Sequence, residues 1–259
     1  MLKNQNYKKK KKEPIFSIIT VVLDGEKYIE KTIKSVLGQS FKNFEYIVVD
    51  GKSKDGTINI IRKYSKKITK WVSEKDKGLY DAFNKGIKMS KGKYICIVNS
   101  DDLLTKNALS TINNYVVLNP DIDFFFGSVK KHWGILHGYR PEKIRYSWGF
   151  YSSHSTGFFI KRISAKKVGQ YNIKYKYHAD YDYFYRMIVN KKLKGMATKK
   201  NEVVGIFRRG GYSSTIPYNK LFYEELKIRL NNGQNIILIM IIAIYKIIKN
   251  FSKFIKKKY

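Results

Sequence analysis

The first half of the chain alternates uninterrupted apolar runs with segments in which apolar residues recur every three or four positions. Such runs are typical of strands buried on both faces of a parallel sheet, and the periodic segments are typical of helices that cover it. The pattern therefore predicts an α/β fold with a doubly wound, mostly parallel sheet. The expected strands are 17–23, 44–49, 69–72, 94–98 and 124–126, and the expected helices are 27–37, 58–64, 80–89 and 106–118.

The second half of the chain is less regular. Residues 132–151 are rich in aromatic side chains but show no period. We interpret 15–230 as one domain, in which 15–128 is a nucleotide-binding half and 129–230 is built for a second ligand. The elements expected after residue 151 are strands over 156–160 and 203–207 and helices over 180–190 and 218–230.

The N-terminal residues 1–14 are predicted to form a basic, flexible tail. The lysine run Lys8–Lys12 precedes the apolar stretch Ile15–Leu23, an order that imitates a secretory signal peptide. No small-residue cleavage site follows, and this stretch is far shorter than the ~20 residues that a helix needs to span a bilayer. We therefore interpret Ile15–Leu23 as the first buried strand.

The C-terminal residues 231–259 are predicted to form a basic amphipathic helix that anchors the protein to a membrane surface. Ile236–Tyr245 is apolar all round, and the helix is expected to continue to about Lys257, with lysines and isoleucine or phenylalanine on opposite faces. The alternative is a helix packed on the domain or on a second subunit. A transmembrane span is not expected, because Lys246 interrupts the apolar run early. The basic face comprises Lys246, Lys249, Asn250, Lys253 and Lys257, and the apolar face comprises Ile247, Ile248, Phe251, Phe254 and Ile255.

The formal net charge is +32, from 52 lysine and arginine residues against 20 acids. Part of this excess fits a codon bias toward lysine, and part indicates attraction to a polyanion. Only eight of the 52 are arginine, which is the side chain preferred for phosphate and base recognition, so an anionic membrane is favoured and no nucleic acid is expected as a partner. The single cysteine, Cys96, permits no intramolecular disulfide and fits a reducing, cytoplasmic compartment.

Acidic residues follow three of the predicted strands: Asp24, Asp50 and the pair Asp101-Asp102. Ligands of open parallel sheets bind beyond the carboxyl ends of the strands, so these carboxylates are expected to converge on one crevice. Each alone would also fit a turn or a helix cap, as expected for Asp55. Oxygen ligands without a histidine or cysteine cluster predict Mn²⁺ or Mg²⁺, held together with a diphosphate. The sequence contains no P-loop or dinucleotide-binding glycine motif.

Three segments carry a family resemblance: "PIFSIITVVLDGEKYIEKTIKSVLGQSFKNFEYIVVDGKSKDGT", "SEKDKGLYDAFNKGIKMSKGKYICIVNSDD" and "HADYDYFYRM". In order and spacing the chain resembles, over about residues 15–215, the family-2 inverting glycosyltransferases of bacterial polysaccharide synthesis. The resemblance implies a GT-A fold and a nucleotide-diphosphate sugar donor, with a UDP-sugar expected.

The resemblance also implies roles for individual acids. Asp50 would contact the base, Asp76 would line the nucleotide pocket, and Asp101 would lie near the ribose or diphosphate. Asp102 would bind the metal ion, and Asp180 would be the catalytic base. From spacing alone Asp180 and Asp182 are equal candidates, and the resemblance favours Asp180.

Other positions are weaker or depart from the family pattern. His154 matches a position expected near the acceptor, and 208–214 resembles a loop on the acceptor side. Asp24 stands where the family usually has Asn, Asn99 where it often has an acid, and Ala179 where it usually has Glu.

The sequence thus predicts a metal-assisted, inverting glycosyltransferase. Its acceptor would be lipid-linked or a glycan, and it would lie on the inner face of the cytoplasmic membrane. Two alternatives are a non-catalytic polyanion-binding protein and a nucleotidyltransferase on a similar fold. The latter would need a basic motif near the first strand, where only Lys27 is available.

Overall fold

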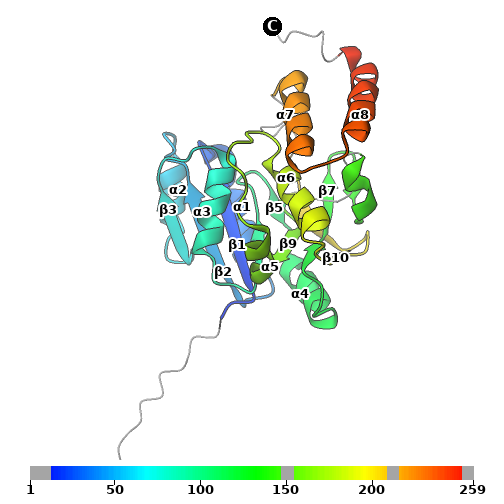
Figure 1. Ribbon diagram of the computed structural model, residues 1–259. Coiled ribbons are helices and arrows are strands. Elements are labelled where there is room, and N and C mark those ends of the chain that lie inside the picture. Colours follow the sequence, from blue (N-terminus) through cyan, green and yellow to red (C-terminus); the bar gives the residue numbers. More distant parts are fainter. Residues whose placement is uncertain (1–12, 147–154, 209–215, 253–259) are drawn as a thin grey trace, which may run out of the picture.

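The structure, a computed structural model, describes residues 13–146, 155–208 and 216–252. A seven-stranded sheet forms the centre, in the order β10-β6-β9-β4-β1-β2-β3 (Figure 1). Strands β1 to β4 are parallel, whereas β9 runs antiparallel to both of its neighbours. The predicted α/β fold with a mostly parallel sheet is therefore confirmed. The strands are β1 (Phe16–Val22), β2 (Phe44–Asp50), β3 (Lys70–Ser73), β4 (Tyr94–Ile97), β6 (Phe124–Phe126), β9 (Phe158–Lys161) and β10 (Gly195–Ala197).

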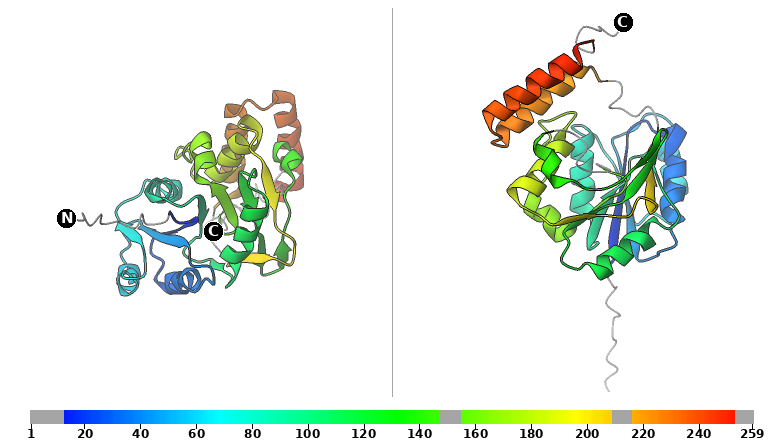
Figure 2. Two further views of the ribbon diagram at one scale, coloured as in Figure 1. Left: turned by 90° about the horizontal axis from the view of Figure 1, so that it is seen from below. Right: turned by 90° about the vertical axis from the view of Figure 1, so that its right-hand side faces the viewer.

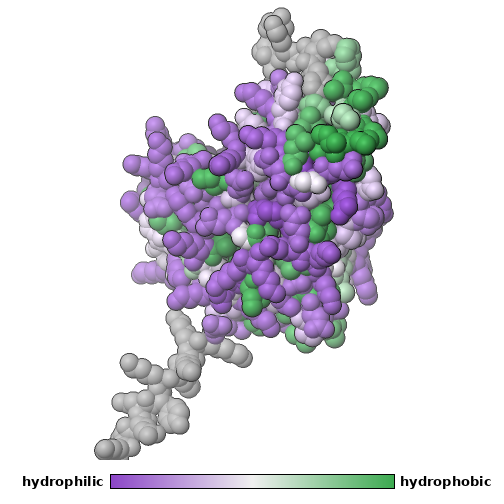
Figure 3. Space-filling model, viewed as in Figure 1, coloured by the Kyte–Doolittle hydropathy of each residue, from purple (hydrophilic) through white to green (hydrophobic). Residues whose placement is uncertain are grey.

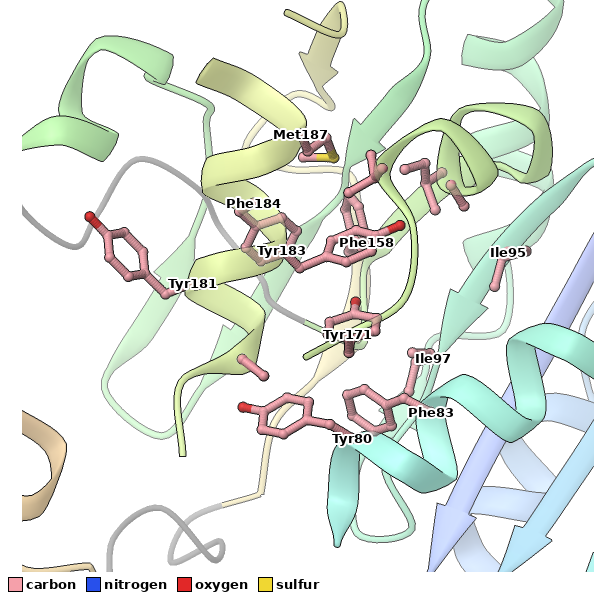
Figure 4. Close-up of a cluster of buried hydrophobic side chains, with 14 of the residues drawn as sticks. Tyr80, Phe83, Ile95, Ile97, Phe158, Tyr171, Tyr181, Tyr183, Phe184 and Met187 are labelled. Atoms are coloured by element: carbon pink, nitrogen blue, oxygen red, sulfur yellow. The ribbon is translucent and has the colours of Figure 1, made fainter. Parts of the chain in front are cut away.

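Helices cover both faces of this sheet (Figure 2). Successive side chains of a strand point to opposite faces, so Ile18 of β1 joins a core with α1, α2 and α4, while Ile19 joins a core with α3, α5 and α6. Figure 4 shows the second core, where Tyr80 and Phe83 of α3 face Tyr171 and the residues of α6. The helices are α1 (Glu26–Leu37), α2 (Thr57–Lys63), α3 (Leu79–Met89), α4 (Ala108–Leu118), α5 (Arg162–Val168) and α6 (Ala179–Tyr185).

A second, four-stranded sheet in the order β5-β11-β7-β8 was not predicted as a unit. Its strands are only two to four residues long, so their sequences carry little periodicity: β5 (Leu103–Leu104), β7 (Ser128–Lys131), β8 (Gly134–Leu136) and β11 (Val203–Ile206). Because β5 directly follows Asp102 and pairs with β11, this small sheet brings residues after 206 to the end of β4.

The region predicted as one helix over 180–190 is divided. Helix α6 ends at Tyr185 and a π-helical turn, Arg186–Asn190, follows it. Strand β10 was not predicted either, since Gly195–Ala197 is only three residues long and shows no recognisable period. A short 3₁₀ helix, Pro141–Arg145, lies in the aromatic-rich region that showed no period.

Helices α7 (Tyr218–Asn231) and α8 (Ile236–Lys249) form an antiparallel hairpin at the end of the molecule opposite the start of β1 (Figures 1 and 2). Strand β1 runs from there toward the hairpin, so the hairpin lies on the side of the sheet's carboxyl edge (Figure 1). None of the helices in the described part of the chain is long and apolar enough to cross a membrane.

One prediction about the C-terminal helix is wrong. Lys246 was expected on an exposed basic face, but its side chain is 14% exposed and its Nζ lies 2.5 Å from Oε2 of Glu225 on α7. The apolar side of α8 faces outward instead: Ile241 is 59% exposed and Ile248 is 72% exposed. Helical spacing places lysines on one face but does not show whether that face meets water or a buried carboxylate.

Candidate functional site

The carboxyl ends of β1, β2 and β4 lie side by side, as the positions of two glycines show. A Cβ atom on Gly25 would lie 3.4 Å from Oγ of Ser100, and one on Gly51 would lie 2.9 Å from Oδ2 of Asp76. The first distance is an ordinary contact, whereas the second is too short for a Cβ atom and favours glycine at position 51, where Leu23 after β1 would also lie 3.4 Å from that atom. The segments after β1, β2 and β4 form one edge, where the sequence placed the candidate site.

Asp102 is almost enclosed at this edge. It is 5% exposed, and Oδ2 accepts hydrogen bonds from Oγ1 of Thr156 at 3.1 Å and from Nδ2 of Asn99 at 3.4 Å. Its Oδ1 accepts from the backbone N–H of Arg208 at 3.2 Å. Burial, and then the charge of Asp101, raise the pKa of Asp102 to about 7.

Asp101 is more accessible, with its side chain 23% exposed, and it pairs with Arg208. The guanidinium Nη2 and Nε of Arg208 donate to Oδ2 of Asp101 at 3.0 and 3.3 Å. The same guanidinium lies 4.0 Å above the ring of Tyr28 on α1. The two acids therefore differ: Asp102 is held by neutral donors, and Asp101 by a cation.

The residues at the end of β4 fit a divalent cation. Asp101 and Asp102 supply two carboxylates, and Oδ1 of Asn99 is buried with no hydrogen-bond partner among the described residues. Mn²⁺ and Mg²⁺ bind through one or two carboxylates and fill other positions with water and substrate phosphates. Within the described ranges, no group of three or more histidine, cysteine, aspartate or glutamate side chains is arranged so that it could hold a metal ion by itself. The ion would thus depend on a donor diphosphate for part of its coordination.

Asp50 is fully buried at the end of β2. Its carboxylate accepts hydrogen bonds from the backbone N–H of Lys52 at 3.0 Å, from Ser53, and from Oγ of Ser73 on β3 at 2.6 Å. These bonds shape the turn after β2 and fix it to the neighbouring strand. A direct contact between Asp50 and a base stays a prediction.

Asp76 lies beside that turn, in the loop between β3 and α3. Nζ of Lys85 is 2.7 Å from its Oδ1, and burial still raises the pKa of the Asp76 carboxyl. Lys85 also lies 2.9 Å from Oε1 of Glu74. Asp76 therefore stands at the sheet edge within a charged cluster, and its place in a nucleotide pocket stays a prediction.

Asp180 and Asp182, equal candidates by spacing, have different surroundings. Oδ1 of Asp180 accepts from the hydroxyl of Tyr80 at 3.2 Å and from the backbone N–H of Tyr181 at 2.9 Å. Burial and the charge of Asp180 raise the pKa of Tyr80 well above its ordinary value, so Tyr80 remains a donor. Asp182 pairs with Arg186 at 2.9 Å and also accepts from Asn232, which makes it a structural residue.

Helix α6 is positioned from two directions. Tyr80 connects its first turn to α3, which begins just after the loop that carries Asp76. From α7, the carboxylate of Glu224 accepts the backbone N–H groups of Lys176, Tyr177 and His178, each at 2.7 Å. The loop before Asp180 is thus held by a residue that sequence reasoning did not identify.

Some predicted residues lie apart from this site or outside the described ranges. His154 and residues 209–214 of the acceptor-side loop lie outside the described residues. Asp24 is exposed and accepts from the backbone N–H of Lys54 at 2.7 Å, which ties the loops after β1 and β2 together. Asp55 accepts the N–H groups of Thr57 and Glu26, each at 3.0 Å, but the N-cap of α2 is Gly56, so Asp55 stabilises the turn before the helix instead of capping it as expected.

Comparison with protein families identifies the group to which this arrangement belongs. The model of glycosyl transferase family 2 matches residues 17–184, from β1 through Asp180 and α6. The chain belongs to glycosyl transferase family 2. This membership confirms the resemblance inferred from the three motifs. It also decides in favour of a glycosyltransferase over the polyanion-binding and nucleotidyltransferase alternatives.

Two relatives span most of this family 2 chain. It is 28% identical over 238 residues to an uncharacterized glycosyltransferase of Methanocaldococcus jannaschii, covering 86% of this chain and 82% of the relative. It is 24% identical over 238 residues to a PGL/p-HBAD biosynthesis glycosyltransferase of Mycobacterium tuberculosis, covering 88% of this chain and 90% of the relative.

Solved structures confirm the GT-A fold. S. aureus TarS 1–349 in complex with UDP aligns over 92% of this chain and 72% of its own, with a TM-score of 0.67 and 19% identity. The mannosyltransferase PcManGT from Pyrobaculum calidifontis, in complex with GDP-Man and Mn²⁺, aligns over 90% and 69%, with a TM-score of 0.63 and 15% identity. The chain spans 39% of the longer TarS chain.

Proposed function

We propose that this family 2 glycosyltransferase transfers a sugar, with inversion, from a nucleotide-diphosphate sugar to a lipid-linked or glycan acceptor. The observation that carries the proposal is the acid pair Asp101-Asp102 at the end of β4. One member is enclosed among neutral donors, and the other is partly exposed and paired with a cation. This arrangement suits a ligand that brings both positive and negative charge, as a metal–diphosphate does.

The proposed donor is a UDP-sugar, bound with Mn²⁺ or Mg²⁺. Support comes from two structural neighbours: TarS was solved with UDP and with UDP-GlcNAc, and PcManGT with GDP-Man and Mn²⁺. Asp101, Asp102 and Asn99 would hold the ion, and Asp50 and Asp76 would form the nucleoside side of the pocket. The bound ion would offset the negative charge that develops on the leaving diphosphate.

Asp180 is the proposed general base. The acceptor hydroxyl would give its proton to the Asp180 carboxylate while its oxygen attacks the anomeric carbon. The bond from that carbon to the diphosphate oxygen breaks on the opposite face, so the anomeric configuration inverts without a covalent enzyme intermediate. Tyr80 supports this role because its hydrogen bond fixes the position of Oδ1 of Asp180.

The proposed location is peripheral, on the inner face of the cytoplasmic membrane. The outward face of α8 is apolar (Figure 3), and this hairpin lies on the side of the molecule where the sheet's carboxyl edge lies (Figure 1). Exposed apolar patches of this kind mark interaction surfaces. The net charge of +32 and the lysine-rich sequence after Phe251 complement anionic lipid headgroups rather than a second copy of this basic chain. A lipid-linked acceptor would be met at that surface.

Donor binding can be tested by thermal unfolding. The protein is heated with each member of a panel of UDP-, GDP- and dTDP-sugars, with and without Mn²⁺. We expect one nucleotide class to raise the melting temperature, and to do so more strongly with the metal, because ligands that bind only the folded state stabilise it. No shift with any nucleotide-sugar, with or without metal, would overturn the proposal.

A further inference from the structure

Arg208 contacts both members of the acid pair through different groups. Its guanidinium donates to Oδ2 of Asp101 from Nη2 at 3.0 Å and from Nε at 3.3 Å. Its backbone N–H donates to Oδ1 of Asp102 at 3.2 Å. The backbone contact fixes the start of the side chain beside Asp102, so the guanidinium can move while its attachment point stays at the site.

A second group supports the guanidinium. Its Cζ lies 4.0 Å from the ring centroid of Tyr28, and its Nη1 donates to the Tyr28 hydroxyl at 3.1 Å. Stacking on an aromatic ring holds a planar guanidinium in place without any contribution from the carboxylate with which it is paired. Tyr28 therefore offers a platform on which Arg208 could remain after it releases Asp101.

The ion pair is accessible from solvent. The side chain of Arg208 is 31% exposed and that of Asp101 is 23% exposed, in contrast to the enclosed Asp102. An accessible pair of this type contributes little to folding stability, typically below about 1 kcal/mol. A ligand can reach it, and the exchange of one partner for another costs little.

Two cations would compete for Asp101 once a metal ion arrives. A metal ion alone would have to displace Arg208 or share Asp101 with it, and repulsion between the cations opposes that. A metal ion that arrives with a diphosphate brings new acceptors for the guanidinium, which binds phosphate oxygens in a bidentate manner. The displaced guanidinium then gains a replacement partner at the same place.

We propose that Arg208 is a donor-binding residue that neutralises Asp101 in the donor-free enzyme and transfers its guanidinium to the donor diphosphate when donor and metal bind together. This inference rests on the proposed function, because it requires a diphosphate ligand. It makes metal and donor binding interdependent: the metal alone binds weakly, and the diphosphate relieves the competition.

The inference predicts opposite effects of one substitution on two ligands. In Arg208→Ala, Mn²⁺ without nucleotide should bind about three- to tenfold more tightly, because a competing cation is removed. The nucleoside diphosphate in saturating Mn²⁺ should bind about tenfold more weakly, because a charge-assisted contact is lost. If Arg208 had only a structural role, Arg208→Ala would weaken the binding of Mn²⁺ and of the nucleoside diphosphate together.

The experiment measures Mn²⁺ binding from the electron paramagnetic resonance signal of the free ion, and UDP and GDP binding by calorimetry in saturating Mn²⁺. Lys27→Ala is the matched control, since Lys27 Nζ also lies near the Tyr28 ring, at 5.4 Å, but has no hydrogen bond to the acid pair. It should change either affinity by less than about twofold. Arg208→Lys, which keeps the charge, should bind Mn²⁺ alone nearly as the wild type does.

Unchanged or weaker Mn²⁺ binding by Arg208→Ala, with a melting temperature near that of the wild type, would overturn the inference. If Arg208→Ala is unstable, Arg208→Lys decides. It should bind UDP or GDP more weakly than the wild type while its Mn²⁺ affinity stays the same, and equal nucleotide affinity would contradict the inference. If the wild type binds neither UDP nor GDP and no nucleotide-sugar of the thermal-unfolding panel raises its melting temperature, the proposed function fails, whereas the Mn²⁺ measurement still reports separately whether Arg208 competes with a metal ion.

Discussion

The hydroxyl of Tyr80, on α3, donates to Oδ1 of Asp180 at 3.2 Å and joins the two halves of the domain at the proposed catalytic base. Tyr80 follows the loop that carries Asp76, and Asp180 opens the helix that ends the family match. This hydrogen bond connects the base directly to the donor half, while Glu224 holds the preceding loop from α7.

Replacement of Asp180 by Asn should lower kcat by about 10²- to 10⁴-fold, the usual contribution of general base catalysis, and leave donor affinity nearly unchanged. Tyr80→Phe keeps the ring packing and should lower kcat by only about three- to tenfold. Steady-state kinetics with the donor identified by thermal unfolding measure both. Asp182→Asn is the matched control: it breaks the Arg186 pair and should lower stability more than turnover per folded molecule. Equal turnover in Asp180→Asn and wild type would place the base elsewhere.

A third carboxylate beside Asp102 should strengthen metal binding. Asn99→Asp places a charge where an amide nitrogen now donates to Oδ2 of Asp102 at 3.4 Å. Repulsion should lower the melting temperature without metal, and Mn²⁺ should raise it by more than in the wild type. The control Asn107→Asp adds the same charge on an exposed residue before α4. A metal-induced shift no larger than that of the wild type would argue against a metal ion at Asn99.

The Glu225–Lys246 pair should make the hairpin sensitive to acid. Burial opposes ionisation of Glu225, but the charges of Lys246 and Arg229 outweigh it and hold the pKa of Glu225 below its ordinary value. A lowered pKa means that this stabilisation is complete above the unfolded pKa of about 4.3 and is lost as pH falls through the folded one.

Glu225→Gln should therefore lower the free energy of unfolding by about 3 kcal/mol at pH 7 and less below pH 4, because it leaves two buried cations without their carboxylate. Urea unfolding across pH 3–7 measures this. Lys249→Met, which removes an exposed lysine near the Tyr245 ring, should change stability little. If Glu225→Gln lowered the free energy of unfolding by the same amount at every pH, this prediction would be contradicted.

The outward face of α8 should bind anionic membranes. A triple replacement of Ile241, Ile244 and Ile248 by Asn should abolish cosedimentation with phosphatidylglycerol vesicles at low salt. Val117→Asn with Leu118→Asn removes apolar side chains that are 68% and 78% exposed on α4, and should leave binding unchanged. If the triple variant sedimented with vesicles as the wild type does, the face would not be the membrane-binding surface. If the wild type were a dimer and the triple variant a monomer, the face would instead be a subunit interface.

Most of the central sheet could be predicted from the sequence because its strands are continuous apolar runs. Phe124–Phe126 has the bounds expected, and β1, β2 and β4 agree within about one residue at most ends. The acids after these strands could be predicted for the same reason, since the end of a buried parallel strand is also the ligand-binding edge.

Contacts between distant segments could not be predicted from local patterns. Arg208 reaches Asp101 across 107 positions through a small sheet of very short strands, which leave almost no periodic signal. Glu224 is one polar residue on a helix until the fold places it under the loop before Asp180. The same limit explains why Lys246 was wrongly expected to be exposed, since its partner Glu225 lies on another helix.

The central claim is that this protein transfers sugar from a metal-bound nucleotide-diphosphate donor held at Asp102. The most direct test is the initial rate of nucleoside diphosphate release from the matching nucleotide-sugar, compared between wild type and Asp102→Asn across a Mn²⁺ titration. We predict that release by the wild type rises with Mn²⁺ and saturates, and that Asp102→Asn is slowed at least about 100-fold with little response to the ion. Asp102→Asn that releases product at the wild-type rate, with the same dependence on Mn²⁺, would contradict the claim.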